Sequence, residues 1–355
     1  MVATATVRRA WWCWCGAAML GLCACSSQPT GKGPRQRLVA DPPLGSGEVP
    51  GAGLADFDRG VALVKKEAYS EAIGYFDKTL AAKPGNAVAH AYRALAKDRT
   101  GDRAGAEQDY KRALELDPKL LEAAINLAAL YLDDAGGKVT PQPDKAIELL
   151  SKAVEQAPPE DQADIRTNLA FAYRLTKNYD KAADQYRMAL QRGEQGSLRF
   201  AFGDMLVEAG RCKEAVEQLV KAAEGYKDDS AKQGRIADEL GGCKAFAECV
   251  TVLDSIVQRE PTKPDWYVRR GVCRHAGGDE AKARADYQEA IKRDAKFAPA
   301  YYFLGMSYRD DKQRLNASKA LDKAVELDRG GQWGGRAKQA LEKMAAEDRA
   351  KNQKK

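Results

Sequence analysis

The chain has 355 residues, of which 30% are charged, and its 57 Lys and Arg against 51 Asp and Glu give a formal net charge of +6. The two signs are interspersed, which excludes the clustered basic face of a nucleic-acid-binding protein, so no nucleic-acid partner is expected. Beyond the first 25 residues, no segment approaches 18 continuous apolar residues, which excludes a further membrane-spanning helix.

Residues 1–24 have the features of a secretory signal peptide. Arg8 and Arg9 precede an apolar run of about 15 residues, too short to cross roughly 30 Å of hydrocarbon as a helix. The run ends in "LCAC", Leu22 to Cys25, which resembles the bacterial lipobox, whose last cysteine is lipidated. The resemblance implies cleavage before Cys25 and attachment of acyl chains to it, which anchor a protein in a membrane without a spanning helix. An ordinary signal peptide and an uncleaved anchor are the alternatives.

Residues 25–53 are rich in Pro, Gly and Ser and show no apolar periodicity. Such composition predicts a flexible tether with an r.m.s. span of roughly 30 Å. The lipobox resemblance implies a place in the bacterial cell envelope. The absence of Asp after Cys25, where Ser26 and Ser27 stand, favours the outer membrane facing the periplasm over the inner membrane.

A pattern of small and large residues repeats through residues 54–330, mostly at intervals of 34. Each unit has a first small residue, a second small residue 12 positions later in seven of eight units, and a large residue four positions after that. The first set is Gly60, Ala94, Ala128, Ala170, Gly203, Ala237, Gly271 and Gly305. The second set is Ala72, Ala106, Ala146, Ala182, Ala215, Cys249, Ala283 and Ala317. The large residues are Phe76, Tyr110, Leu150, Tyr186, Leu219, Leu253, Tyr287 and Leu321.

This spacing predicts two helices per unit that cross closely at the small residues, with the large side chain one turn further along the same face. Pro84, Pro118, Pro158 and Pro261 follow their second helices and end them, because proline cannot continue a helix. One hairpin cannot bury its apolar stripe alone, so the units must stack on one another.

The segment "YYFLGMSYRDDKQRLNASKALDKAVELD", residues 301–328, resembles the tetratricopeptide repeat, a pair of antiparallel helices. The resemblance implies an all-α fold, an α-solenoid wound as a right-handed superhelix of about eight helical hairpins. Residues 331–350 carry apolar side chains at helical spacing, from Trp333 to Met344, which predicts a C-terminal capping helix before a basic tail at 351–355.

The third unit contains an insertion, because 18 residues instead of 12 separate Ala128 from Ala146. The extra residues fall within 133–144, where two glycines and two prolines predict a loop between the helices. The loop is either a neutral insertion or an element that binds a partner.

Four cysteines remain in the predicted solenoid, an even number for an oxidising compartment. Cys212 and Cys243 fall at the inter-helix turns of neighbouring units, and because such turns stack, we favour a disulfide between them. Cys249 could then pair with Cys273 on the first helix of the next unit, or both could be buried free thiols. A metal site is disfavoured, since no CxxC occurs and the two histidines, His90 and His275, lie five units apart.

No catalytic constellation and no Gly-rich phosphate loop is evident in the sequence. We therefore expect no enzymatic activity, no cofactor and no small-molecule substrate, with an enzyme only as a remote alternative. The resemblance implies a protein-binding module whose concave groove is formed by the first helices. It places on that groove Phe57, Val61, Ala91, Leu95, Ile125, Phe171, Arg174, Phe200, Asp204, Val268, Tyr302, Met306 and Arg309.

The partners implied are other envelope proteins, held in this groove, and the membrane, held through lipid on Cys25. The Lys and Asn set with which some tetratricopeptide-repeat proteins clamp a C-terminal carboxylate is not evident. We favour a scaffold that assembles an envelope complex of the secretin, pilus or motility type. The alternative is an adaptor that recruits periplasmic peptidoglycan hydrolases or synthases, and the sequence leaves the oligomeric state open.

Overall fold

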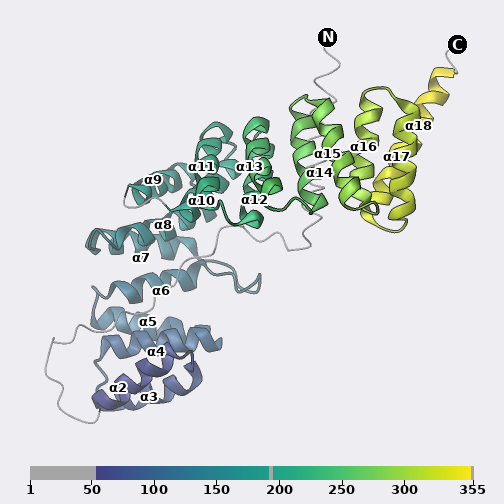
Figure 1. The fold of residues 1–355 in the computed structure, drawn as a ribbon. Helices are drawn as coiled ribbons and strands as arrows, with labels where there is room; N and C mark the ends of the chain where they lie inside the picture. Colours follow the sequence, from purple (N-terminus) through teal and green to yellow (C-terminus); the bar gives the residue numbers. More distant parts are fainter. Residues whose placement is uncertain (1–52, 192–194, 353–355) are drawn as a thin grey trace. The chain divides into compact units, whose positions relative to one another are not determined.

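The computed structural model describes residues 53–191 and 195–352, which form 17 α-helices labelled α2 to α18 and contain no strand (Figure 1). The all-α architecture of consecutive hairpins with a final single helix is therefore confirmed. The predicted signal peptide, the lipidated Cys25, the tether up to residue 52 and the last three residues lie outside the described residues.

The described chain divides into two compact units, with the boundary between Leu198 and Arg199. The N-terminal unit has the hairpins α2 (Gly53–Lys65) with α3 (Tyr69–Ala82), α4 (Ala87–Thr100) with α5 (Arg103–Leu116), α6 (Leu121–Leu132) with α7 (Pro143–Gln156), and α8 (Gln162–Leu175) with α9 (Tyr179–Leu190). The C-terminal unit has α10 (Gly196–Glu208) with α11 (Cys212–Gly225), α12 (Ser230–Gly242) with α13 (Phe246–Arg259), α14 (Pro264–Ala276) with α15 (Glu280–Arg293), α16 (Ala298–Asp310) with α17 (Arg314–Leu327), and the single helix α18 (Gln332–Asn352).

The sequence predicts one array, whereas the structure has two units. The boundary falls in the first turn of α10, and the helix before it, α9, has 12 residues where the other second helices have 14.

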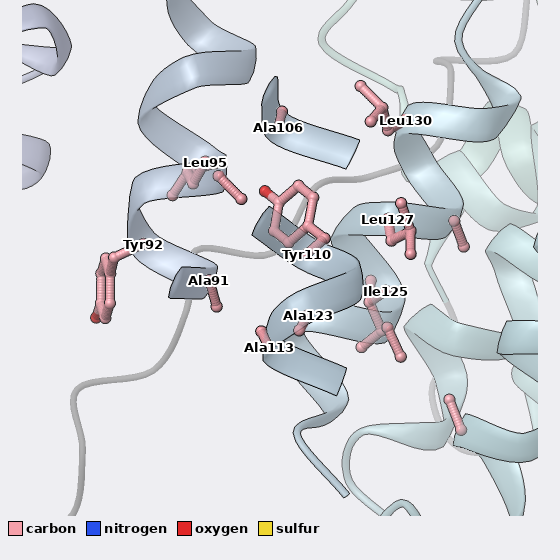
Figure 2. Close-up of a cluster of buried hydrophobic side chains, with 14 of the residues drawn as sticks. Ala91, Tyr92, Leu95, Ala106, Tyr110, Ala113, Ala123, Ile125, Leu127 and Leu130 are labelled. Atoms are coloured by element: carbon pink, nitrogen blue, oxygen red, sulfur yellow. The ribbon is translucent and has the colours of Figure 1, made fainter. Parts of the chain in front are cut away.

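In the four hairpins whose first small residue is glycine, that residue lies against the large residue of the same hairpin, as the spacing predicts. A Cβ atom built on Gly271 would come within 2.5 Å of the Tyr287 ring, and one on Gly305 within 2.7 Å of Leu321. The fully buried Tyr110 shows the same packing between hairpins. Its ring, on α5, lies between Leu95 of α4 and Leu127 of α6 (Figure 2). The residues that define the repeat pattern are therefore residues that pack helices against one another.

The turn between the two helices uses a left-handed residue at the same repeat position in seven hairpins. Glycine takes this conformation without strain, and it stands there as Gly101, Gly210 and Gly278. The third hairpin differs because the predicted insertion forms a loop from 133 to 142, in which Ala135, Gly136 and Gly137 are consecutive left-handed residues.

The capping helix α18 covers the end of the eighth hairpin. Trp333 is 6% exposed, and its ring lies 5.4 Å from that of Tyr302 and 5.3 Å from that of Phe303. Asp328 caps the helix, because its Oδ2 accepts hydrogen bonds from the backbone N–H groups of Trp333 at 2.8 Å and Gly334 at 3.1 Å. The predicted packing of Trp333 is confirmed.

A buried ion cluster joins the first and second hairpins. Arg93 on α4 donates to both oxygens of Asp109 on α5, at 2.6 and 2.8 Å, and to Asp77 on α3 at 2.7 Å. Lys97 adds a further bond to Asp109 at 2.8 Å. The Asp109 side chain is only 6% exposed, so these cations replace the water that a carboxylate needs.

The same cluster recurs between the sixth and seventh hairpins, with every residue 177 positions later. Arg270 donates to both oxygens of Asp286, at 2.6 and 3.1 Å, and to Asp254 at 2.8 Å. Arg274 donates to Asp286 at 2.9 Å. At these two positions the third, fourth and eighth hairpins have Leu and Tyr, the fifth and sixth have two apolar residues each, and the first has Arg59 and Leu63.

Candidate binding surface

Several first helices of successive hairpins lie in contact with one another. In the N-terminal unit α2 contacts α4, α4 contacts α6, and α6 contacts α8; in the C-terminal unit α14 contacts α16. Elements on the inside of a bend approach one another more closely than those outside it. We therefore take the first helices as the inner face of each unit.

Four of the predicted groove residues are core residues, and the prediction is wrong for them. Ala91 and Leu95 are 0% exposed, Ile125 is 1% exposed and Val268 is 2% exposed. Because neighbouring first helices pack so closely, these side chains lie between helices and touch no solvent, as Leu95 and Ile125 do in Figure 2.

Six further apolar candidates are only 5–8% exposed, and they are Phe57, Val61, Phe171, Phe200, Tyr302 and Met306. The aromatic members of this set make packing contacts. The ring centre of Phe57 lies 5.7 Å from that of Tyr92, and the ring centre of Tyr302 lies 5.2 Å from that of Phe303. These side chains can form the floor of a binding surface, but their main role is to hold the hairpins together.

The three charged candidates are also largely enclosed. Arg174 and Asp204 are each 8% exposed. The Arg309 guanidinium donates to Asp310 at 3.0 and 3.2 Å, which leaves its side chain 18% exposed. A partner could reach the edges of these groups more readily than their whole surfaces.

The structure adds a set of inner-face residues on α12 and α14 that the sequence analysis missed. Asp238 forms an ion pair with Arg269 at 3.0 Å, and Asp265 forms another at 2.9 Å. The Arg269 guanidinium lies 5.2 Å from the centre of the Trp266 ring. Asp238 keeps 39% of its side chain exposed and Asp265 keeps 32%, so a partner can compete for these carboxylates.

A glycine makes this arrangement possible. A Cβ atom on Gly234 would lie 2.7 Å from the Trp266 ring, so glycine lets the ring approach α12 this closely. Beside it, Arg235 is exposed and its guanidinium lies 5.0 Å from the centre of the Phe200 ring. The signal in the sequence was a glycine three residues before the repeat's own small residue, Ala237.

The structure has two disulfides in the C-terminal unit: the pair that the sequence favours, Cys212–Cys243, and the pair Cys249–Cys273, which the sequence leaves open beside two free thiols. Cys212 pairs with Cys243 across a Cα–Cα distance of 5.2 Å, and Cys249 pairs with Cys273 across 6.3 Å. Both distances fall in the usual range for disulfides. The bonds link three successive hairpins, the fifth to the sixth and the sixth to the seventh.

The two histidines have separate protein partners. His90 lies with Nε2 3.0 Å from the carbonyl oxygen of Pro84, and His275 lies with Nδ1 2.6 Å from Glu280. Within the described ranges, no group of three or more His, Cys, Asp or Glu side chains could hold a metal ion. No helix within those ranges is both long and apolar enough to cross a bilayer.

Comparisons with known proteins place this arrangement in context. Two family models described as tetratricopeptide repeat match the chain, one at 37–87 and 142–197 and the other at 89–120 and 298–330. Sperm-associated antigen 1 of Mus musculus is 28% identical over 63% of this chain and 25% of its own length. The Hsp70-Hsp90 organizing protein of Triticum aestivum is 27% identical over 55% of this chain and 33% of its own length.

The chain thus spans about a quarter to a third of the length of these two relatives. A solved tetratricopeptide repeat protein from Parabacteroides merdae superposes with a TM-score of 0.48 at 17% identity, over 72% of this chain and 98% of that one. The matches to the family models include the whole of the first, fourth and eighth hairpins and all but one residue of the second, and the chain therefore carries tetratricopeptide repeats.

Proposed function

We propose that the protein is a non-enzymatic scaffold that binds segments of partner proteins along the inner faces of its repeats. Tetratricopeptide-repeat proteins are protein–protein interaction scaffolds, which supports this reading. The observation that carries it is the arrangement around Asp238, Arg269 and Trp266, where exposed carboxylates lie beside an aromatic ring on the inner face. A partner segment can pair with the charges and pack on the ring.

The proposal includes an anchor in the bacterial envelope. The resemblance of Leu22 to Cys25 to a lipobox supports lipid on Cys25, and residues 26–53 then tether the repeats to the membrane. The scaffold assembles or stabilises an envelope complex of the secretin, pilus or motility type.

Replacing Cys25 by alanine tests the anchor. Because acyl chains on this cysteine hold the protein to the membrane, Cys25→Ala is expected to shift the chain from the membrane fraction to the soluble fraction after detergent-free washing. Cys23→Ala is the matched control, and it should leave the chain membrane-bound. A Cys25→Ala protein that stays in the membrane fraction contradicts the lipid anchor.

Photo-crosslinking tests the inner face as a binding surface. A photoreactive amino acid at Asp238 is expected to form adducts with an envelope protein in living cells, whereas one at Lys323 on the second helix α17 should not. The two side chains are comparably exposed, at 39% and 40%, so accessibility alone does not separate them. Equal labelling at both positions, or none at Asp238, would overturn the assignment.

The identity of the adducts separates the two candidate roles. Secretin, pilus or motility subunits, identified by mass spectrometry, support the assembly role. Peptidoglycan hydrolases or synthases support the alternative, an adaptor that recruits cell-wall enzymes.

A further inference from the structure

The two disulfides of the C-terminal unit differ in their exposure. Cys249 is 0% exposed and Cys273 is 4% exposed, so the bond between α13 and α14 is buried. Cys212 and Cys243 are both partly exposed; Cys212 is the first residue of α11 and Cys243 follows the last residue of α12. A reductant in solution therefore reaches the second pair far more readily than the first.

Helix α12, which ends at the exposed disulfide, has a weak apolar anchor. Ile236 and Leu240 are the large apolar side chains among its buried residues, which otherwise are Gln233, Gly234, Ala237 and Gly241. The first helix α16, in contrast, buries Tyr302, Phe303, Leu304 and Met306. Burial of apolar area is the main contribution that holds hairpins together. Because α12 buries little of it, its position depends on hydrogen bonds, ion pairs and the disulfide.

Besides the Asp238–Arg269 ion pair, those other bonds lie at its two ends. Near its start, Gln233 donates to the carbonyl oxygen of Ala223 on α11 at 3.2 Å and accepts from Arg259 on α13 at 2.5 Å. At its end, Cys243 caps the helix and is bonded to Cys212, the first residue of α11. The disulfide thus fixes the end of α12 that glycines would otherwise leave loose, since Gly241 and Gly242 precede it.

We infer that the Cys212–Cys243 bond is a redox-sensitive latch that fixes α12 against α11, while Cys249–Cys273 is a permanent bond. A dithiol reductant opens the latch by thiol–disulfide exchange. Its thiolate attacks the Cys243 sulfur, the bond to Cys212 breaks, and Cys212 leaves as a thiolate. The second thiol of the reductant then attacks the mixed disulfide, so that the reductant becomes a disulfide and both cysteines become thiols.

The position of Cys212 favours this direction of attack. As the first residue of α11, it lies at the positive end of the helix dipole, where a thiolate is stabilised. A stabilised thiolate is the better leaving group in exchange. A reductant in solution has little access to the Cys249–Cys273 pair, because Cys273 is only 4% exposed and Cys249 is 0% exposed.

Opening the latch would also alter the inner face. Arg235 and Asp238 lie on α12, next to Phe200 of α10 and Arg269 of α14 respectively. Release of α12 separates these neighbours and divides the surface. This consequence rests on the proposed function, whereas the latch itself does not.

The test combines disulfide mapping with hydrogen exchange on the full chain, using graded dithiothreitol and no partner. We expect Cys212–Cys243 to be reduced first, with a loss of amide protection in residues 230–242 while α16 keeps its protection, and recovery after reoxidation. The variant with Cys212→Ser and Cys243→Ser should show the same loss without reductant. The variant with Cys249→Ala and Cys273→Ala is the matched control, and its latch should still open at the same concentration.

Two results would overturn the latch. One is reduction of both disulfides at the same concentration, and the other is full protection of residues 230–242 once Cys212 and Cys243 are thiols. Neither result bears on whether a partner crosslinks at Asp238 in the oxidised chain, so failure of the latch and failure of the proposed function remain distinct.

Discussion

Replacing Asp109 by alanine is expected to lower the free energy of unfolding of the N-terminal unit by about 3 kcal/mol. Asp109 compensates Arg93 and Lys97, whose side chains are only 19% and 20% exposed. Without the carboxylate, both cations stay largely out of water and repel each other. Urea unfolding, followed by hydrogen exchange in residues 53–191, measures the loss for this unit separately from the other.

Two comparisons make the Asp109 result specific. Glu115→Ala breaks an exposed pair with Arg112 in the same helix, and it should cost less than about 0.5 kcal/mol. A triple variant with Arg93→Leu, Lys97→Tyr and Asp109→Leu installs the residues of the third hairpin and should recover most of the lost stability, because it removes the unpaired charges. An Asp109→Ala chain as stable as Glu115→Ala would show that the cluster contributes nothing.

The cluster also gives this unit a pH dependence. Burial alone would raise the pKa of Asp109, but hydrogen bonds from Arg93 and Lys97 outweigh it and hold the pKa below its ordinary value. A carboxyl group with a lowered folded-state pKa contributes stability above its unfolded pKa and loses it as the pH falls through the folded value. The difference between the chain and its Asp109→Ala variant should therefore be full at pH 7 and shrink below about pH 4.

The repeat pattern made much of the fold predictable, because it records contacts inside one hairpin. Gly271 and Tyr287 are 16 residues apart, and their contact depends only on local helix geometry and one turn. The disulfide between Cys212 and Cys243 was predictable for a similar reason, because stacking of neighbouring turns brings these two cysteines together.

The binding surface was harder to predict, because exposure on an inner face depends on how closely neighbouring hairpins approach. Leu95 and Ile125 occupy inner-face positions of the repeat, yet close packing of α4, α5 and α6 leaves them 0% and 1% exposed. Trp266 and Arg269 came to the inner face only because Gly234 leaves room on the preceding hairpin. Such information lies in pairs of residues from different repeats rather than in the position within one repeat.

The buried ion clusters were also hard to predict from the sequence of one repeat. Asp77, Arg93 and Asp109 each look like an ordinary solvated charge on a helix surface when the sequence is read one helix at a time. Their recurrence 177 positions later, as Asp254, Arg270 and Asp286, is visible only when two distant repeats are compared.

Replacing Trp333 by alanine is expected to detach the capping helix and to lower the free energy of unfolding of the C-terminal unit by about 3–5 kcal/mol. Trp333 is 6% exposed and packs on both Tyr302 and Phe303. Once α18 is released, these rings meet water, so the variant should also aggregate at concentrations where the unaltered chain does not. Circular dichroism with urea measures the stability, and light scattering measures the aggregation.

Three observations should accompany this loss if α18 acts as a cap. Trp333→Phe should keep most of the stability, because a smaller ring still covers part of Tyr302 and Phe303. Leu315→Ala should change the stability by less than about 0.5 kcal/mol, since that side chain is 67% exposed. Hydrogen exchange in the N-terminal unit should stay unchanged, because each repeat contacts only its neighbours. Loss of protection at α2 to α9 in Trp333→Ala would instead mean that the two units unfold as one.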